Sequence, residues 1–195
     1  MIKLGITGNI ATGKSTVENL LQQEGYPVID ADKIVHDLYK EPAFIEKISD
    51  IFKGEDVFEN NSLSRKKIGS LVFKDKDKLK SLENILHPEV KKKIKEYFKQ
   101  NEDKPVAVAS IPLLFEAKME DLFDFIITVF VDEKTQIERL IARNGYSLEE
   151  AKQRISCQIP QEEKKKLANF VIDNSGSIEN TKKQLNQILN HILKT

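Results

Sequence analysis

The sequence predicts an α/β protein in which a five-stranded parallel sheet lies between two layers of helices. Apolar runs of strand length recur at residues 3–7, 27–30, 105–110, 125–131 and 170–173, and segments with helical periodicity separate them. Such runs are typical of parallel strands that helices cover on both faces. A chain of 195 residues with this pattern fits one doubly wound domain of three layers.

The first apolar run leads directly into a glycine-rich motif. Residues 8–15 read Gly-Asn-Ile-Ala-Thr-Gly-Lys-Ser, which matches the G-x-x-x-x-G-K-[ST] pattern of a phosphate-binding P-loop. A predicted strand precedes the motif and a predicted helix follows it, which is the context that this loop requires. The motif therefore predicts a nucleotide-binding site. The alternative is a turn that only caps the helix and leaves Lys14 in solvent.

Each residue type in the motif suits a phosphate ligand. Gly8 and Gly13 allow backbone conformations that turn successive N–H groups toward phosphate oxygens. Lys14 supplies a mobile positive charge, and a helix that starts near Gly13 adds free N–H groups and the positive end of its dipole. We expect the Ser15 hydroxyl to ligate a magnesium ion that bridges phosphates, with Thr16 as a second hydroxyl in the first turn.

Charge and cysteine content narrow the class of protein. Charged residues make up 32% of the chain and cancel to a formal net charge of zero, which argues against a dedicated nucleic-acid or membrane-surface protein. The single cysteine, Cys157, forms no intrachain disulfide, and the three histidines lack zinc-ligand spacing. No apolar run reaches membrane-spanning length, and we expect no cleavable signal before the first strand. A cytoplasmic protein fits these features best.

Two helical segments are too long to be simple crossovers between strands. We interpret residues 36–103 as a helical insertion that covers an acceptor substrate. Residues 139–166 contain a capping-box signature at Ser147–Glu150 and carry several arginines, so they predict a lid that closes over phosphates. The single domain then has its core at about 1–35, 104–138 and 167–195, and its last helix spans 178–193.

A P-loop alone is compatible with a kinase, a GTPase, a motor ATPase or a nucleotide sensor. No Asn-Lys pair occurs in the chain, so the guanine-reading N-K-x-D motif is absent. The length and the two helical segments favour a small-molecule or nucleotide kinase. Asp30 ends the second strand and Asp32 lies just beyond it, and both could reach the site. Asp32 would lie beside the P-loop and take the proton of an alcohol acceptor. The alternative for Asp32 is that it caps the next helix.

In their order and spacing, the motifs resemble the dephospho-coenzyme A kinase family over essentially the whole chain. The resemblance rests on residues 5–16, 28–32, 86–88, 112–116, 136–143 and 171–176. It implies a nucleotide-kinase-like P-loop fold that transfers the γ-phosphoryl group of ATP, with Mg²⁺, to the ribose 3′-hydroxyl of dephospho-CoA. This is the last step of coenzyme A synthesis, and the chain would be a monomer or a small homo-oligomer. The alternatives are another kinase on the same scaffold and a non-catalytic nucleotide-binding switch.

The resemblance also implies roles for individual residues. Asp32 would be the general base, and Arg143 would be the lid arginine that acts with Lys14 on the transferring phosphoryl group. The ATP site would comprise Gly8, Ala11, Thr12, Gly13, Lys14, Ser15, Thr16 and, at the adenine, Asn174, and the acceptor pocket would be lined by His87, Leu114, Phe115 and Glu116. Plain structural roles remain open for Arg143 as an exposed helix residue, for His87 at a helix start, for Leu114 and Phe115 in the core, and for Asn174 in a turn.

The chain departs from the family pattern at three places. Asn9 and Ala11 stand where glycines are usual in the P-loop. An arginine common a few residues after Asp32 is replaced around Val35–His36, so Lys33 or Arg65 is our hypothesis for that charge. Ser64 replaces the usual acidic residue before Arg65.

Overall fold

A computed structural model describes residues 1–194, which divide into two compact units. The core unit comprises Met1–Asp30 and Glu96–Thr195, and the insertion unit comprises Ala31–Lys95. The chain thus leaves the core directly after its second strand. Within the described part of the chain, no helix combines the length and the apolar character that a bilayer crossing needs.

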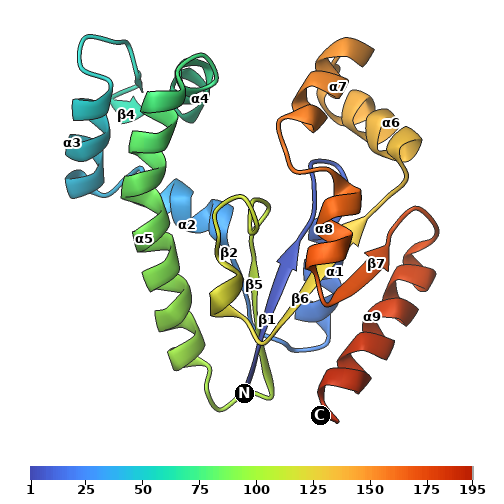
Figure 1. Cartoon of the computed structure of the whole chain (residues 1–195). Helices are drawn as coiled ribbons and strands as arrows, with labels where there is room; N and C mark the ends of the chain where they lie inside the picture. The colour runs from blue at the N-terminus through green and yellow to red at the C-terminus, as the bar shows by residue number, and fades with distance from the viewer. Residues whose placement is uncertain (195) are drawn as a thin grey trace. The chain divides into compact units, whose positions relative to one another are not determined.

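The core unit is built on a five-stranded sheet, as predicted (Figure 1). All neighbouring strands are parallel, and their order is β2-β5-β1-β6-β7. The strands are β1 (Ile2–Thr7), β2 (Val28–Asp30), β5 (Val106–Ser110), β6 (Phe125–Phe130) and β7 (Phe170–Asp173). Because all strands run the same way, the P-loop and the segments after β2 and β5 begin at one edge of the sheet. That edge is where ligands bind in open α/β sheets.

Alternate residues of β1 face the two helical layers. Leu4 and Ile6 are fully buried against α1 (Lys14–Gln23) and α9 (Ile178–Ile192), which form one layer. Gly5 faces the other layer, where an added Cβ would lie 3.0 Å from the Phe123 ring. That ring packs edge-to-face on Phe98, near the end of α5 (Lys76–Gln100), with 6.0 Å between centroids. The sheet is therefore covered on both faces, which confirms the three-layer prediction.

Three short helices follow β6 in the predicted lid region (Figure 1). They are α6 (Glu133–Asn144), α7 (Leu148–Ser156) and α8 (Gln161–Leu167). Gly145 ends α6 at φ 69°, a backbone conformation that favours glycine. Both hydrogen bonds of the predicted Ser147–Glu150 capping box are present at the start of α7. The sequence thus located the start of this helix correctly.

The insertion unit consists of helices and one small hairpin. Its elements are α2 (Ala31–Leu38), α3 (Pro42–Ile51), β3 (Phe58–Glu59), β4 (Ser62–Leu63), α4 (Arg65–Val72) and most of α5 (Lys76–Gln100). The sequence analysis did not predict the hairpin. Asn60 and Asn61 form its turn with φ values of 49° and 61°, which is the left-handed geometry that two-residue hairpin turns require.

Candidate active site

The P-loop backbone needs glycine at two positions. Gly13 is the N-cap of α1 at φ 84°, and an added Cβ would lie 2.1 Å from Nδ2 of Asn174. At Gly8 an added Cβ would lie 2.7 Å from the Thr12 hydroxyl and 2.9 Å from the Val129 carbonyl oxygen. No side chain fits at either position without displacing these neighbours. The loop therefore has the close-packed, left-handed geometry that an anion-binding turn uses.

Lys14 is held at the centre of the sheet edge. Its Nζ lies 2.5 Å from Oε1 of Glu18, and only 14% of the side chain is exposed. The ammonium also donates to the Ser110 hydroxyl, which donates to the same Glu18 oxygen. Ser110 ends β5, the neighbour of β1, so the charge lies between two strand ends. This excludes the alternative of a lysine in solvent.

Neither Glu18 nor Ser110 was among the predicted site residues. The four-residue spacing of Lys14 and Glu18 on one helix was the available signal, because such pairs are neighbours on a helix surface. Ser110 carried no local signal, since its contact depends on the pairing of β1 with β5.

Ser15 is exposed in the first turn of α1, directly after Lys14. Among the described residues there is no group of three or more His, Cys, Asp or Glu that would enclose a metal ion. Mg²⁺ at nucleotide sites keeps several waters and takes phosphate oxygens with one or two protein oxygens. A lone hydroxyl at the mouth of a P-loop fits that donor set.

Asn174 ties the P-loop to α9. Its Nδ2 donates to the Thr12 carbonyl oxygen at 2.9 Å, and its Oδ1 accepts from the Thr181 hydroxyl at 2.8 Å. The Asn174 side chain is therefore occupied by the protein itself. Its own carbonyl oxygen accepts from Nη2 of Arg139 at 3.0 Å. Arg139 thus lies next to the P-loop, although the sequence placed it only as the first residue of the predicted lid segment 139–166.

Arg143 lies one turn after Arg139 on α6, and residues at this spacing share one face of a helix. Arg143 is exposed, and its Nε donates to Oδ1 of Asn144 at 2.9 Å. The structure thus places Arg139 at the P-loop and Arg143 in solvent near the end of α6. Both guanidinium groups belong to α6, whose second half lies in the predicted lid segment 139–166.

The predicted acceptor wall after β5 has one polar member. Leu114 and Phe115 are buried at 0% and 5% exposure, and Leu114 packs near Gly5 of β1. Oε1 of Glu116 lies 2.9 Å from Nζ of Lys164 and accepts from the Ile159 N–H at 3.1 Å. Lys164 was not predicted, because a lysine in the run 164–166 reads as a solvated helix face. Its burial lowers the pKa of its ammonium, which Glu116 partly offsets.

Asp32 and His87 both lie in the insertion unit. Asp32 is exposed. It is the second residue of α2, after Ala31, so it lies inside the helix and the alternative that it is the N-cap is wrong. His87 is half-buried inside α5, which also contains Pro88. The alternative of a residue at a helix start is therefore also wrong. Burial lowers the pKa of the His87 imidazole.

Ala11 adopts a backbone conformation that usually requires glycine, with φ 64°. Left-handed backbone strains a residue other than glycine by about 1–2 kcal/mol in the folded state. Glycine avoids this strain but lowers stability by roughly 0.4–1 kcal/mol, because it gives the unfolded chain more conformational entropy. We expect Ala11→Gly to raise the free energy of unfolding by about 0.5–1 kcal/mol in urea titrations. Ala142→Gly, at an exposed site inside α6, should instead lower it by about 1 kcal/mol. Equal losses in both variants would contradict strain at Ala11.

Comparisons with known proteins identify the family of this chain. A family model described as dephospho-CoA kinase matches residues 2–180. A protein of Carboxydothermus hydrogenoformans named dephospho-CoA kinase is 47% identical over 190 residues, which cover 95% of this chain and 92% of that protein. A protein of the same name from Oceanobacillus iheyensis is 42% identical over 192 residues, with 95% of each chain covered.

Solved structures give the same result. The structure of TT1252 from Thermus thermophilus superposes with a TM-score of 0.86 at 36% identity, covering 98% of this chain and 97% of that one. Dephospho-CoA kinase from Campylobacter jejuni gives a TM-score of 0.72 at 32% identity and the same coverage. Shikimate kinase from Bacteroides thetaiotaomicron, at 14% identity and a TM-score of 0.56, shares the fold. The P-loop chain described here belongs to the dephospho-CoA kinase family.

Proposed function

We propose that this chain transfers the γ-phosphoryl group of ATP to the ribose 3′-hydroxyl of dephospho-CoA and so completes coenzyme A synthesis. One observation carries the proposal. In a chain of this family, a P-loop with both required glycines begins where β1 ends, and Lys14 is held between the ends of β1 and β5. This is the arrangement that neutralises the charge of a transferring phosphoryl group.

The ATP phosphates bind to the P-loop, residues 8–16. Backbone N–H groups at the start of α1 and the positive end of its dipole attract the phosphate oxygens. When a triphosphate binds, the Lys14 ammonium leaves Glu18 and pairs with phosphate oxygens, because the triphosphate carries more negative charge than one carboxylate. Ser15 would hold Mg²⁺, and the ion would supply further neutralisation of the phosphate charge.

Two lid arginines complete the nucleotide site. Arg139 already lies at the P-loop through its bond to Asn174, and Asn174 holds the Thr12 carbonyl. Arg143 is on the same helix face and steadies the transferring group when the lid closes. Closure also excludes water, which would otherwise compete with the acceptor for the phosphoryl group. In the bound state, the adenine lies against the backbone around Asn174.

Asp32 is the general base of the proposed reaction. Its carboxylate takes the proton of the 3′-hydroxyl while the hydroxyl oxygen bonds to the γ-phosphorus and ADP leaves. The support is chain connectivity, since Asp32 comes two residues after the end of β2 in the parallel sheet. His87 and the segment Leu114–Glu116 bind the acceptor. We further propose a cytoplasmic monomer or small homo-oligomer without nucleic-acid or membrane partners.

An acceptor panel tests this function. Purified chain with ATP and Mg²⁺ should release ADP in a coupled assay only when dephospho-CoA is added, and mass spectrometry should show one added phosphate on the ribose. Phosphorylation of a nucleoside monophosphate on its phosphate, with dephospho-CoA inert, would favour another kinase of this fold. Binding of ATP without acceptor-dependent turnover would indicate a nucleotide-binding switch and overturn the proposal.

A further inference from the structure

Lys164 is a buried charge that the proposed reaction does not use. Its side chain, on α8, is 1% exposed. The ammonium lies 2.9 Å from Oε1 of Glu116 and donates to the Pro112 carbonyl oxygen at 3.0 Å. A buried ion pair rarely adds net stability, because removing both charges from water is costly. The better-supported use of such a pair is to fix how two segments meet.

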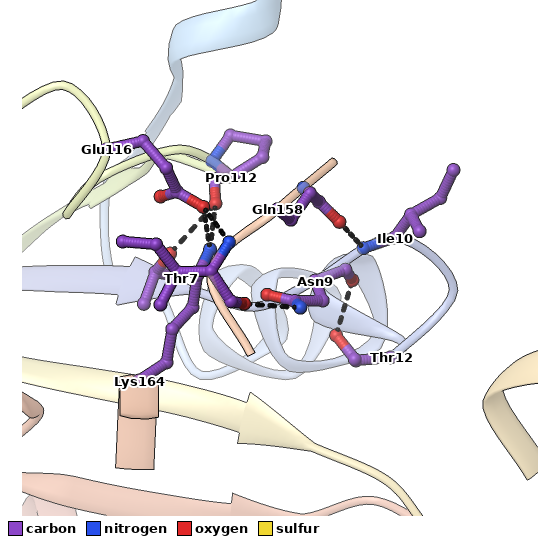
Figure 2. A network of polar contacts seen from close by, with 9 residues as sticks. Thr7, Asn9, Ile10, Thr12, Pro112, Glu116, Gln158 and Lys164 are labelled. Atoms are coloured by element: carbon purple, nitrogen blue, oxygen red, sulfur yellow. Dashed lines mark hydrogen bonds and ion pairs between the residues drawn. The ribbon is translucent and has the colours of Figure 1, made fainter. Parts of the chain in front are cut away.

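The segment that Lys164 holds is also tied to the start of the P-loop. The Pro112 carbonyl oxygen accepts a second hydrogen bond, from the Thr7 hydroxyl at 3.1 Å, and Thr7 immediately precedes Gly8 (Figure 2). The other contact of Glu116 is with the N–H of Ile159, at 3.1 Å. Oε2 of Glu116 is buried and accepts no hydrogen bond from the described residues. The segment after β5 is thus held at both ends while one carboxylate oxygen stays unpaired.

The same part of the chain also holds the first half of the P-loop. The Ile159 carbonyl oxygen accepts from Nδ2 of Asn9 at 2.9 Å, and Oε1 of Gln158 accepts from the Ile10 N–H at 2.8 Å (Figure 2). Residues 158–164, which we call the return strap, therefore contact the P-loop through one end and Glu116 through Ile159 and Lys164. The two bonds to the P-loop span about 150 residues of sequence, so they join segments that only the fold brings together.

We infer that Lys164 is a positioning residue for phosphoryl transfer, which holds Pro112 and Glu116 at a fixed place relative to the P-loop. The inference rests on the proposed function, in which the segment after β5 binds the acceptor. A displacement of about 1 Å at a reacting centre lowers rates by about a hundredfold. The position of Pro112 and Glu116 relative to the P-loop therefore affects turnover.

Two variants test the inference. Lys164→Met removes the cation and leaves the Glu116 carboxylate, whose side chain is 21% exposed, without its ion-pair partner. The variant Lys164→Met/Glu116→Gln removes both charges at similar volume and so guards against simple misfolding. Relative to wild type, we expect kcat/KM for dephospho-CoA to fall by about ten- to a hundredfold in both, with the KM for ATP changed less than twofold. Lys166→Met, an exposed neighbour on α8, is the control and should match wild type. Wild-type kinetics in Lys164→Met, or a double variant no slower than Glu116→Gln alone, would overturn the inference.

Hydrogen exchange gives a reading that does not depend on the substrate. In the double variant, peptides covering residues 8–12 and 156–160 should exchange faster than in wild type, because the return strap loses the ion pair that holds it and the hydrogen bonds of the Ile10 and Ile159 amides open more often. Unchanged exchange would overturn the inference even if activity fell. A wild-type protein that leaves dephospho-CoA unphosphorylated would instead contradict the proposed function. The exchange data would then still test whether Lys164 and Glu116 hold the return strap on the P-loop.

Discussion

Replacing Lys14 with alanine is expected to abolish measurable phosphorylation of dephospho-CoA, with kcat reduced by about a thousandfold or more. The ammonium is the only side-chain cation of the P-loop motif, and it stabilises charge that grows as the phosphoryl group leaves ADP. Its removal also leaves the Glu18 carboxylate beside the phosphates without its partner. Steady-state ADP release, with ATP affinity measured separately by calorimetry, provides the test.

A double variant separates the two causes of this loss. Lys14→Ala/Glu18→Gln removes the carboxylate as well, so it should recover part of the ATP affinity and little of kcat. Lys183→Ala, at an exposed position of α9, controls for the loss of one positive charge and should retain full activity. A Lys14→Ala protein that keeps kcat within tenfold of wild type would remove this lysine from the mechanism.

The Asp32→Asn variant is expected to lose at least about a hundredfold in kcat while ATP binding stays within twofold of wild type. Asparagine keeps the size of the side chain but accepts no proton, so only the chemical step suffers. Single-turnover kinetics with saturating ATP measure that step directly. The matched control is Asp37→Asn on the same helix, whose carboxylate pairs at the surface with Lys40 at 3.1 Å. Equal rates in Asp32→Asn and wild type would exclude this carboxylate as the base.

Local signals were enough to predict the sheet and the phosphate-binding loop. The strands are mainly apolar runs, as in residues 106–109, because a strand covered on both faces needs apolar side chains on both. A capping box joins two residues that are only three positions apart, so the sequence shows it directly. Ser147 and Glu150 therefore predicted the start of α7 correctly. The hairpin at 58–63 was missed because its strands have two residues each, too few to show periodicity.

By itself, therefore, the sequence determined the five strands, their parallel α/β class and the loop that binds phosphate, since these depend on residues close together in the chain. The tertiary structure alone decided which polar side chains meet from segments far apart in the sequence. Ser110 meets Lys14 because β5 pairs with β1, and Lys164 is buried on Glu116 because α8 packs near the end of that sheet. A lysine in a charged run gives no sign of burial, because its surroundings come from segments about fifty residues away in sequence.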